Sequence, residues 1–189
     1  MTQPSLSARR THSSLRAALV DLVEESGFDA VTVTALCDRA LVGRATFYRY
    51  YTDKFDLAAR FFDDALDDLL ASVDDEGVSH RQRWRGFLDH VAQNDRLYRA
   101  LLVTSPQQWF AARMQARLAA MADTHLPEHG IFGPGSDTAV AGVVAAIFVQ
   151  SISWWLAGGR SVPTQVIADG TARLARAVVS EACAPVSGR

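Results

Sequence analysis

Side chains that can donate hydrogen bonds to a polyanion follow one another closely between residues 44 and 54. Arg44 carries a planar guanidinium that can donate two hydrogen bonds to the edge of a guanine. The hydroxyls of Thr46, Tyr48 and Tyr50 can donate to phosphate oxygens. Lys54, the only lysine in the chain, stands at the expected start of a helix, where its charge and the helix dipole would both attract phosphate. The chemistry of this segment predicts binding to a nucleic acid.

The residues around this segment predict a helix-turn-helix. Thr32 is the expected N-cap of a short helix that runs to about Arg39, and Leu41-Val42-Gly43 breaks that helix. A second short helix is predicted from Arg44 to about Tyr50. Two such helices pack at a steep angle, and the second can enter a DNA groove with its N-terminal end foremost. Ala45 is small enough to let the backbone approach a duplex closely.

At these residues the chain resembles the TetR family of bacterial transcriptional regulators. The matching positions are Thr32-Val33, Leu36, Ala40, Val42, Thr46-Phe47-Tyr48, Tyr50-Tyr51, Asp53-Lys54 and Leu57, and the resemblance covers roughly residues 9–70. It implies that Tyr48 and Lys54 touch phosphates and that Arg44 reads a base. The full set of residues expected to contact DNA is Thr32, Thr34, Arg44, Ala45, Thr46, Tyr48, Arg49, Tyr50 and Lys54.

Three positions depart from the pattern of the family. Leu41 occupies the turn position that usually holds Gly or Asn, and a left-handed backbone is strained for leucine. Gly43 replaces the usual Ser or Thr cap, and Ala45 replaces a usual Gly or Ser. We expect either strain or an altered turn at Leu41, and a weakly capped but usable start of the following helix.

Charge is distributed unevenly along the chain. The 189 residues carry 19 basic and 21 acidic side chains, and 49% are hydrophobic, which suits a packed domain and excludes a disordered or fibrous protein. Residues 1–16 hold Arg9, Arg10 and Arg16 and no acid, whereas residues 61–76 hold seven acids and no base. Any anion-binding surface should therefore lie near the N-terminus. The residues before His12 lack a periodic pattern, so we expect a flexible basic arm whose arginines could reach along a duplex.

The rest of the chain is predicted to be helical as well, which makes the fold all-α with about nine helices. The family resemblance implies a helix-turn-helix domain over residues 9–70 and a helical effector-binding and dimerisation domain over residues 75–189. Residues 139–157 are almost uniformly apolar and approach the length of a membrane span, but Gln150, Ser151 and Ser153 interrupt them. We expect residues 139–157 and 163–182 to form a four-helix bundle between two protomers.

Aromatic residues in the C-terminal half could line an apolar effector pocket, although aromatics at helical spacing are more often core. The favoured candidates are Trp84, Phe87, Phe110 and Met114, because they belong to the helices that surround such a pocket in proteins that this chain resembles. His90 and Arg113 could add polar specificity.

No set of residues predicts catalysis or metal binding. Neither a Ser/His/Asp set nor a Gly-rich phosphate loop occurs, and Pro127 interrupts the helical face that His125 and His129 would need to bind a metal. Cys37 and Cys183 suggest neither a disulfide nor a zinc framework. Together with a polar N-terminus that lacks a signal peptide, they favour a cytoplasmic protein.

These features predict a homodimeric, ligand-responsive transcriptional regulator that needs no cofactor. It would bind a palindromic operator in double-stranded DNA and, as a repressor, be released by a small apolar effector. Two alternatives stay open. One is a helical sensor or protein-interaction module that no longer reads DNA, which the strain at Leu41 and the net charge of −2 favour. The other is a membrane-associated protein that uses residues 139–157.

Overall fold

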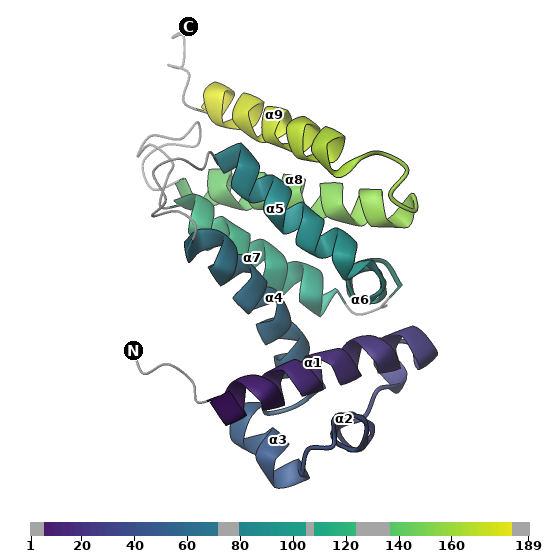
Figure 1. The fold of residues 1–189 in the computed structure, drawn as a ribbon. Coiled ribbons are helices and arrows are strands. Elements are labelled where there is room, and N and C mark those ends of the chain that lie inside the picture. The colour runs from purple at the N-terminus through teal and green to yellow at the C-terminus, as the bar shows by residue number, and fades with distance from the viewer. Residues whose placement is uncertain (1–5, 72–79, 105–107, 124–136, 183–189) are drawn as a thin grey trace, which may run out of the picture.

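The computed structural model describes residues 6–71, 80–104, 108–123 and 137–182, and the regular elements in these ranges are all helical (Figure 1). This confirms the predicted all-α fold. The segment with His125 and His129, and Cys183, lie outside the described residues. In chain order the elements are α1 (Leu6–Ser26), the 3₁₀ turn η1 (Phe28–Ala30), α2 (Val33–Ala40), α3 (Arg44–Tyr50), α4 (Lys54–Ala71), α5 (His80–Gln93), α6 (Asp95–Arg99), the π-helical turn η3 (Ala100–Thr104), α7 (Trp109–Asp123), α8 (Asp137–Ala157) and α9 (Thr164–Ala182).

Helices α1, α2 and α3 form one end of the molecule, and α8 and α9 lie toward the other (Figure 1). The predicted bounds of α2 and α3 agree with the structure to within one residue. Thr32 caps α2, since its hydroxyl oxygen accepts a hydrogen bond from the N–H of Ala35 at 3.1 Å. After the break, the N–H of Val42 donates to the carbonyl of Cys37 at 2.9 Å, which closes the helix before α3 begins.

The prediction of a flexible arm before His12 is wrong for residues 6–11, the part of that segment that the structure describes. Helix α1 begins at Leu6, so Arg9 and Arg10 lie on its first turns and not in an irregular segment. Ala8 is buried, and the ring of His12 lies with its centroid 4.7 Å from that of Tyr50. These contacts come from residues far along the chain, and a pattern of neighbouring residues does not reveal them.

Helix α4 leads from the helix-turn-helix end to the rest of the molecule (Figure 1). Its start is capped by Asp53, whose Oδ1 accepts a hydrogen bond from the N–H of Asp56 at 2.8 Å. A single cluster of buried apolar side chains continues from Leu15 in α1, through Phe62 in α4, to Ala168 in α9. Because the core is continuous, the division into residues 9–70 and 75–189 stays a prediction.

Helix α8 is apolar on nearly all sides and packs against both α7 and α9. By length and composition Thr138–Ala157 could cross a membrane, with 44% of its most apolar window buried inside the protein. Packing on two sides is the behaviour of a core helix in a globular protein. Its end is tied to the following turn by Trp155, whose Nε1–H donates to the carbonyl of Val162 at 2.8 Å.

Candidate nucleic-acid interface

Helix α3 has one face in the core and one face in solvent. Phe47 is completely buried and Tyr51 is 2% exposed, and their rings lie 5.6 Å apart. These two aromatics fix the rotation of the helix about its axis. Tyr48 and Arg49 consequently lie on the exposed side, and Arg44, the first residue of the helix, is exposed as well. Figure 1 shows α3 at the end of the molecule opposite α9, so the C-terminal half does not cover this face.

The guanidinium groups on this face are available to a ligand. Arg44 has no carboxylate within 4.0 Å among the described residues, and Arg49 lies over the ring of its neighbour Tyr50 at 5.1 Å. Arg39 of α2 behaves differently, because it pairs with Glu25 at 2.7 Å and is therefore occupied within the protein. Long, unpaired arginines on an exposed helix of seven residues suit contact with phosphates and base edges.

The remaining residues that are predicted to contact DNA differ in how exposed their side chains are. Ala45 and Thr34 are exposed, and Thr46 and Tyr50 are half-buried. Thr32 is exposed, but its side-chain oxygen is already used as the cap of α2. The structure thus places these residues on α2 and α3, and their contact with DNA stays a prediction.

Lys54 has a use that the sequence does not reveal. Its ammonium donates three hydrogen bonds to backbone carbonyls, those of Phe28 at 3.0 Å, Asp29 at 2.8 Å and Val31 at 2.9 Å. The ammonium also lies 5.0 Å from the ring centroid of Phe28 and 5.4 Å from that of Phe55. A lysine has three donors, so all are satisfied within the protein. Lys54 fastens the start of α4 to the turn between α1 and α2, and a phosphate would have to compete with these carbonyls.

The turn before α3 has the usual geometry despite its unusual residue. Leu41 adopts φ 54° and ψ 40°, the left-handed conformation in which Gly or Asn is favoured. Its N–H donates to the carbonyl of Asp38 at 3.3 Å. The side chain is 94% exposed, so no packing compensates the strain. The turn is therefore regular, and of the two outcomes expected at Leu41 the structure has the strained one.

The sequence model of the "Bacterial regulatory proteins, tetR family" matches residues 15–61, which span most of α1 through the first half of α4. The matched residues are those that build the helix-turn-helix described above. Residues 15–61 therefore form a helix-turn-helix domain of the TetR type.

Two relatives are similar to parts of this chain. An uncharacterised HTH-type transcriptional regulator, YdeS of Bacillus subtilis, is 46% identical over 44 residues, which cover 23% of this chain and only 22% of YdeS. The HTH-type transcriptional activator FasR of Mycolicibacterium smegmatis is 24% identical over 173 residues, covering 84% of this chain and 78% of FasR.

Solved structures of the TetR family share the fold over nearly the whole chain. A TetR-family regulator of Syntrophomonas wolfei aligns with a TM-score of 0.67 at 14% identity, over 95% of this chain and 99% of that one. FadR of Bacillus subtilis in complex with stearoyl-CoA aligns with a TM-score of 0.62 at 15% identity, over 89% and 98%. Identities this low establish a common fold alone.

The TetR-family fold places most of the predicted effector-binding residues in one aromatic cluster between α4, α5 and α7. Phe87 stacks on Trp84 with centroids 5.5 Å apart, and Phe62 of α4 contacts both Phe87 and Phe110 at 6.0 and 5.8 Å. Met114 is fully buried beside them.

The two polar candidates behave differently from each other. His90 joins the cluster and forms a hydrogen bond with the hydroxyl of Tyr98 at 3.1 Å between heavy atoms. Burial raises the pKa of Tyr98, so this phenol stays protonated. Arg113 does not join the cluster. It lies exposed on α7 and pairs with Asp63 of α4.

Proposed function

We propose that this protein is a homodimeric repressor of the TetR family that binds a palindromic DNA operator through α3 and is released by a small apolar effector. The exposed face of α3, with its unpaired Arg44, is the observation that carries the DNA-binding part of the proposal. The dimer and effector parts rest on separate observations, given below.

An apolar groove between α8 and α9 supports dimerisation. It has a volume of about 740 Å³, and its walls include Val143 and Trp154 of α8 and Val166 and Leu174 of α9. These four side chains are 46–58% exposed, which is unusual for large apolar residues grouped on one surface. A Cβ added at Gly170 would meet nothing, so a partner helix could approach α9 closely there. We expect a second copy of the chain to cover this groove around a two-fold axis.

The buried aromatic cluster around Phe87 supports an apolar effector. Its side chains come from α4, α5 and α7, so a ligand that separated them would also move α4, which leads to α3. FadR of Bacillus subtilis, which shares the fold, binds stearoyl-CoA, a ligand with a long apolar chain. An effector can shift the equilibrium between two dimer geometries only by its difference in affinity for them.

The alternative, a module that no longer reads DNA, rests on the strain at Leu41 and on the net charge of −2. Leu41 does adopt the strained left-handed conformation, but the turn keeps its regular geometry and α3 keeps an exposed face, which favours the DNA-binding proposal. We also propose that the protein is cytoplasmic, because it would meet its operator DNA in that compartment.

Selection from a random pool of duplexes by the purified protein tests the DNA-binding proposal. We expect enrichment of a (pseudo)palindrome whose half-sites are about 34 Å, or a multiple of that distance, apart. Enrichment of a single unrepeated site would contradict the dimer, and the absence of any enriched sequence at physiological salt would contradict DNA reading.

The oligomeric state in solution tests whether the groove between α8 and α9 is the dimer interface. Leu174→Glu should convert the dimer to a monomer in analytical ultracentrifugation, because it would bury a charge in an apolar interface. Val103→Glu is the matched control, since Val103 is 40% exposed and lies outside the groove. A wild-type chain that sediments as a monomer would contradict the proposed dimer.

A further inference from the structure

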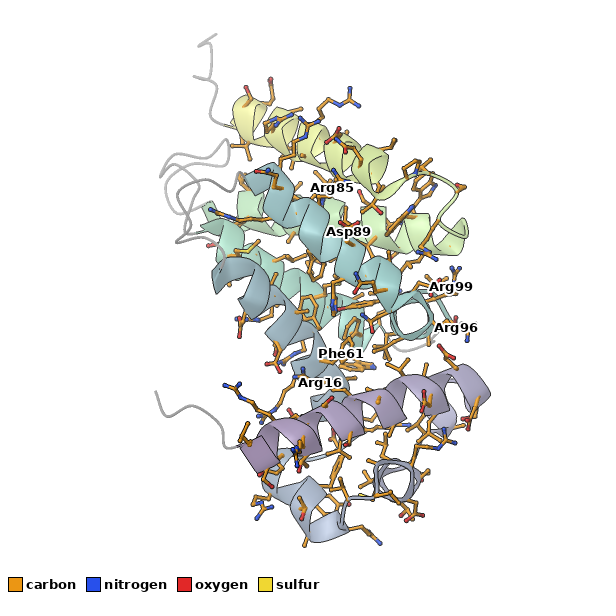
Figure 2. The ribbon with its side chains drawn as sticks, viewed as in Figure 1. Arg16, Phe61, Arg85, Asp89, Arg96 and Arg99 are labelled. Carbon is orange, nitrogen blue, oxygen red and sulfur yellow. The ribbon has the colours of Figure 1, made fainter. Side chains whose placement is uncertain are left out.

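A cavity of about 680 Å³ lies between α1 and α4, where the helix-turn-helix end meets the rest of the molecule. Figure 2 shows Arg16 of α1 and Phe61 of α4 in this region. Tyr51 at the end of α3 and Asn94 before α6 also line it. Small-molecule pockets enclose about 300–1,000 Å³, so the space is sufficient for a ligand.

Positive charge gathers on the walls of this cavity. Arg9 and Arg16 line it from α1, and Arg60 lines it from α4. Arg16 pairs with Asp64, and Arg60 pairs with Asp56 of its own helix at 3.0 Å. Arg9 has no carboxylate within 4.0 Å in the described ranges of the chain. Three guanidinium groups and one carboxylate, that of Asp64, line the cavity, and Asp56 pairs with Arg60 from outside the lining, so a net positive charge remains.

The ion pairs do not use all the donors of these arginines. The Nε–H of Arg16 is buried and has no hydrogen-bond partner among the residues that the structure describes. The side chain of Asp64 is 53% exposed and that of Arg60 is 52% exposed, so water competes for both ion pairs. A ligand oxygen that reached these guanidinium groups would make charge-assisted hydrogen bonds that the protein itself leaves unmade.

Apolar surface lies directly beside the charges. Phe61 and Val20 line the same cavity, and the guanidinium of Arg16 is 5.8 Å from the ring centroid of Phe61. The guanidinium of Arg60 is 5.6 Å from the ring centroid of Tyr51, which also lines the cavity. The walls therefore combine cationic groups with flat apolar surface, which suits a molecule that is anionic at one end and apolar at the other.

His12 also lies on the wall and can report on an anion. Its Nδ1 forms a hydrogen bond with the hydroxyl of Tyr51 at 2.5 Å. Burial, followed by the charges of Arg16 and Arg60, lowers the pKa of His12 below 6.5. The charged and titratable groups around the ring and the cavity are Arg9 and Arg16 on α1, Tyr50 and Tyr51 at the end of α3, and Asp56, Arg60 and Asp64 on α4. A bound anion would offset the arginine charges and raise the pKa of His12.

We propose that the cavity between α1 and α4 binds a small organic anion, with a carboxylate or phosphate group held by the three arginines and an apolar body lying against Phe61 and Val20. The cavity adjoins the aromatic cluster between α4, α5 and α7, since the ring of Phe61 lies 5.5 Å from that of His90, but its arginines make it chemically different from that cluster. Its existence does not depend on whether the chain binds DNA, so a failed operator selection leaves it to be judged by its own test.

Benzoate and phenyl phosphate are suitable probes, because each joins one anionic group to one ring, and benzamide is the neutral match of benzoate. In an NMR titration of the full chain, the imidazole resonance of His12 is identified by its loss in His12→Gln. We expect at least one of the two anions to shift this resonance and to raise the pKa of His12, and benzamide to leave both unchanged. The tighter of the two anions distinguishes a carboxylate ligand from a phosphate ligand.

Two variants and a matched control locate the site. Arg16→Gln and Arg60→Gln should each weaken binding of the probe anion by about tenfold, through loss of a charged donor. Arg10→Gln should leave the affinity unchanged, because Arg10 is an exposed arginine on the same helix that does not line the cavity. Arg60→Gln is the safer variant, since its side chain is half exposed and its loss should not disturb the fold.

Three results would overturn the proposal. The first is a pKa of His12 that neither anion raises, and the second is an equal response to benzamide. The third is an affinity that falls as much in Arg10→Gln as in Arg60→Gln, which would mean general attraction to a basic surface.

Discussion

Replacing Lys54 with methionine should destabilise the protein by an amount that the structure allows to be worked out. Hydrogen bonds from a charged donor contribute about 1.5–3 kcal/mol each. The bond to Asp29 is exposed, so water can replace the ammonium there, whereas the bonds to Phe28 and Val31 are partly buried. Two such losses, reduced because water still reaches part of each carbonyl, predict a decrease of about 2–4 kcal/mol in the free energy of unfolding. Methionine keeps the length and apolar stem of the side chain, so packing changes little.

Urea unfolding at a fixed protein concentration measures this change, since dimerisation would make the stability depend on concentration. With a slope of about 2 kcal/mol/M, the midpoint should fall by about 1–2 M while the slope stays the same. Arg10→Met is the matched control, because Arg10 is exposed and has no ion pair among the described residues. A loss for Lys54→Met below about 0.5 kcal/mol, equal to that of the control, would refute the structural role and leave phosphate contact as the better explanation.

Three further results are expected. Arg44→Ala should relax the preference at one base pair of the operator by about 1–3 kcal/mol, measured by competition between operator variants, whereas loss of an exposed arginine on α9 should not change base preference. Leu41→Gly should stabilise the fold by up to about 1 kcal/mol, because relief of about 1–2 kcal/mol of strain exceeds the entropy cost of glycine. Leu41→Ala keeps the Cβ and should show no gain, so equal midpoints for the two variants would argue against strain. Because burial and the charges of Arg16 and Arg60 lower the pKa of His12, the unfolded chain takes up a proton first as the pH falls. The free energy of unfolding should therefore decrease below about pH 6.5, and His12→Gln should remove that part of the decrease.

Local signals along the chain were sufficient for the helix-turn-helix. The cap at Thr32, the break at residues 41–43 and the apolar spacing of α4 each involve residues within about four positions of one another, so they can be recognised without a tertiary structure. The buried positions of Trp84 and Phe87 followed from the same helical spacing.

By itself, then, the amino-acid sequence determined the helical class, the bounds of α2 and α3 and the presence of a TetR-type helix-turn-helix. Only the tertiary structure decided what Lys54 and His12 contact, because their partners Val31 and Tyr51 lie 23 and 39 positions away in the chain. It also showed that α1 begins at Leu6 and that a charged cavity, lined by Arg16 and Phe61, lies between α1 and α4. Hydrogen bonds, ion pairs and cavities arise where distant segments meet, and the periodicity of a single segment carries no information about which other segment it will face.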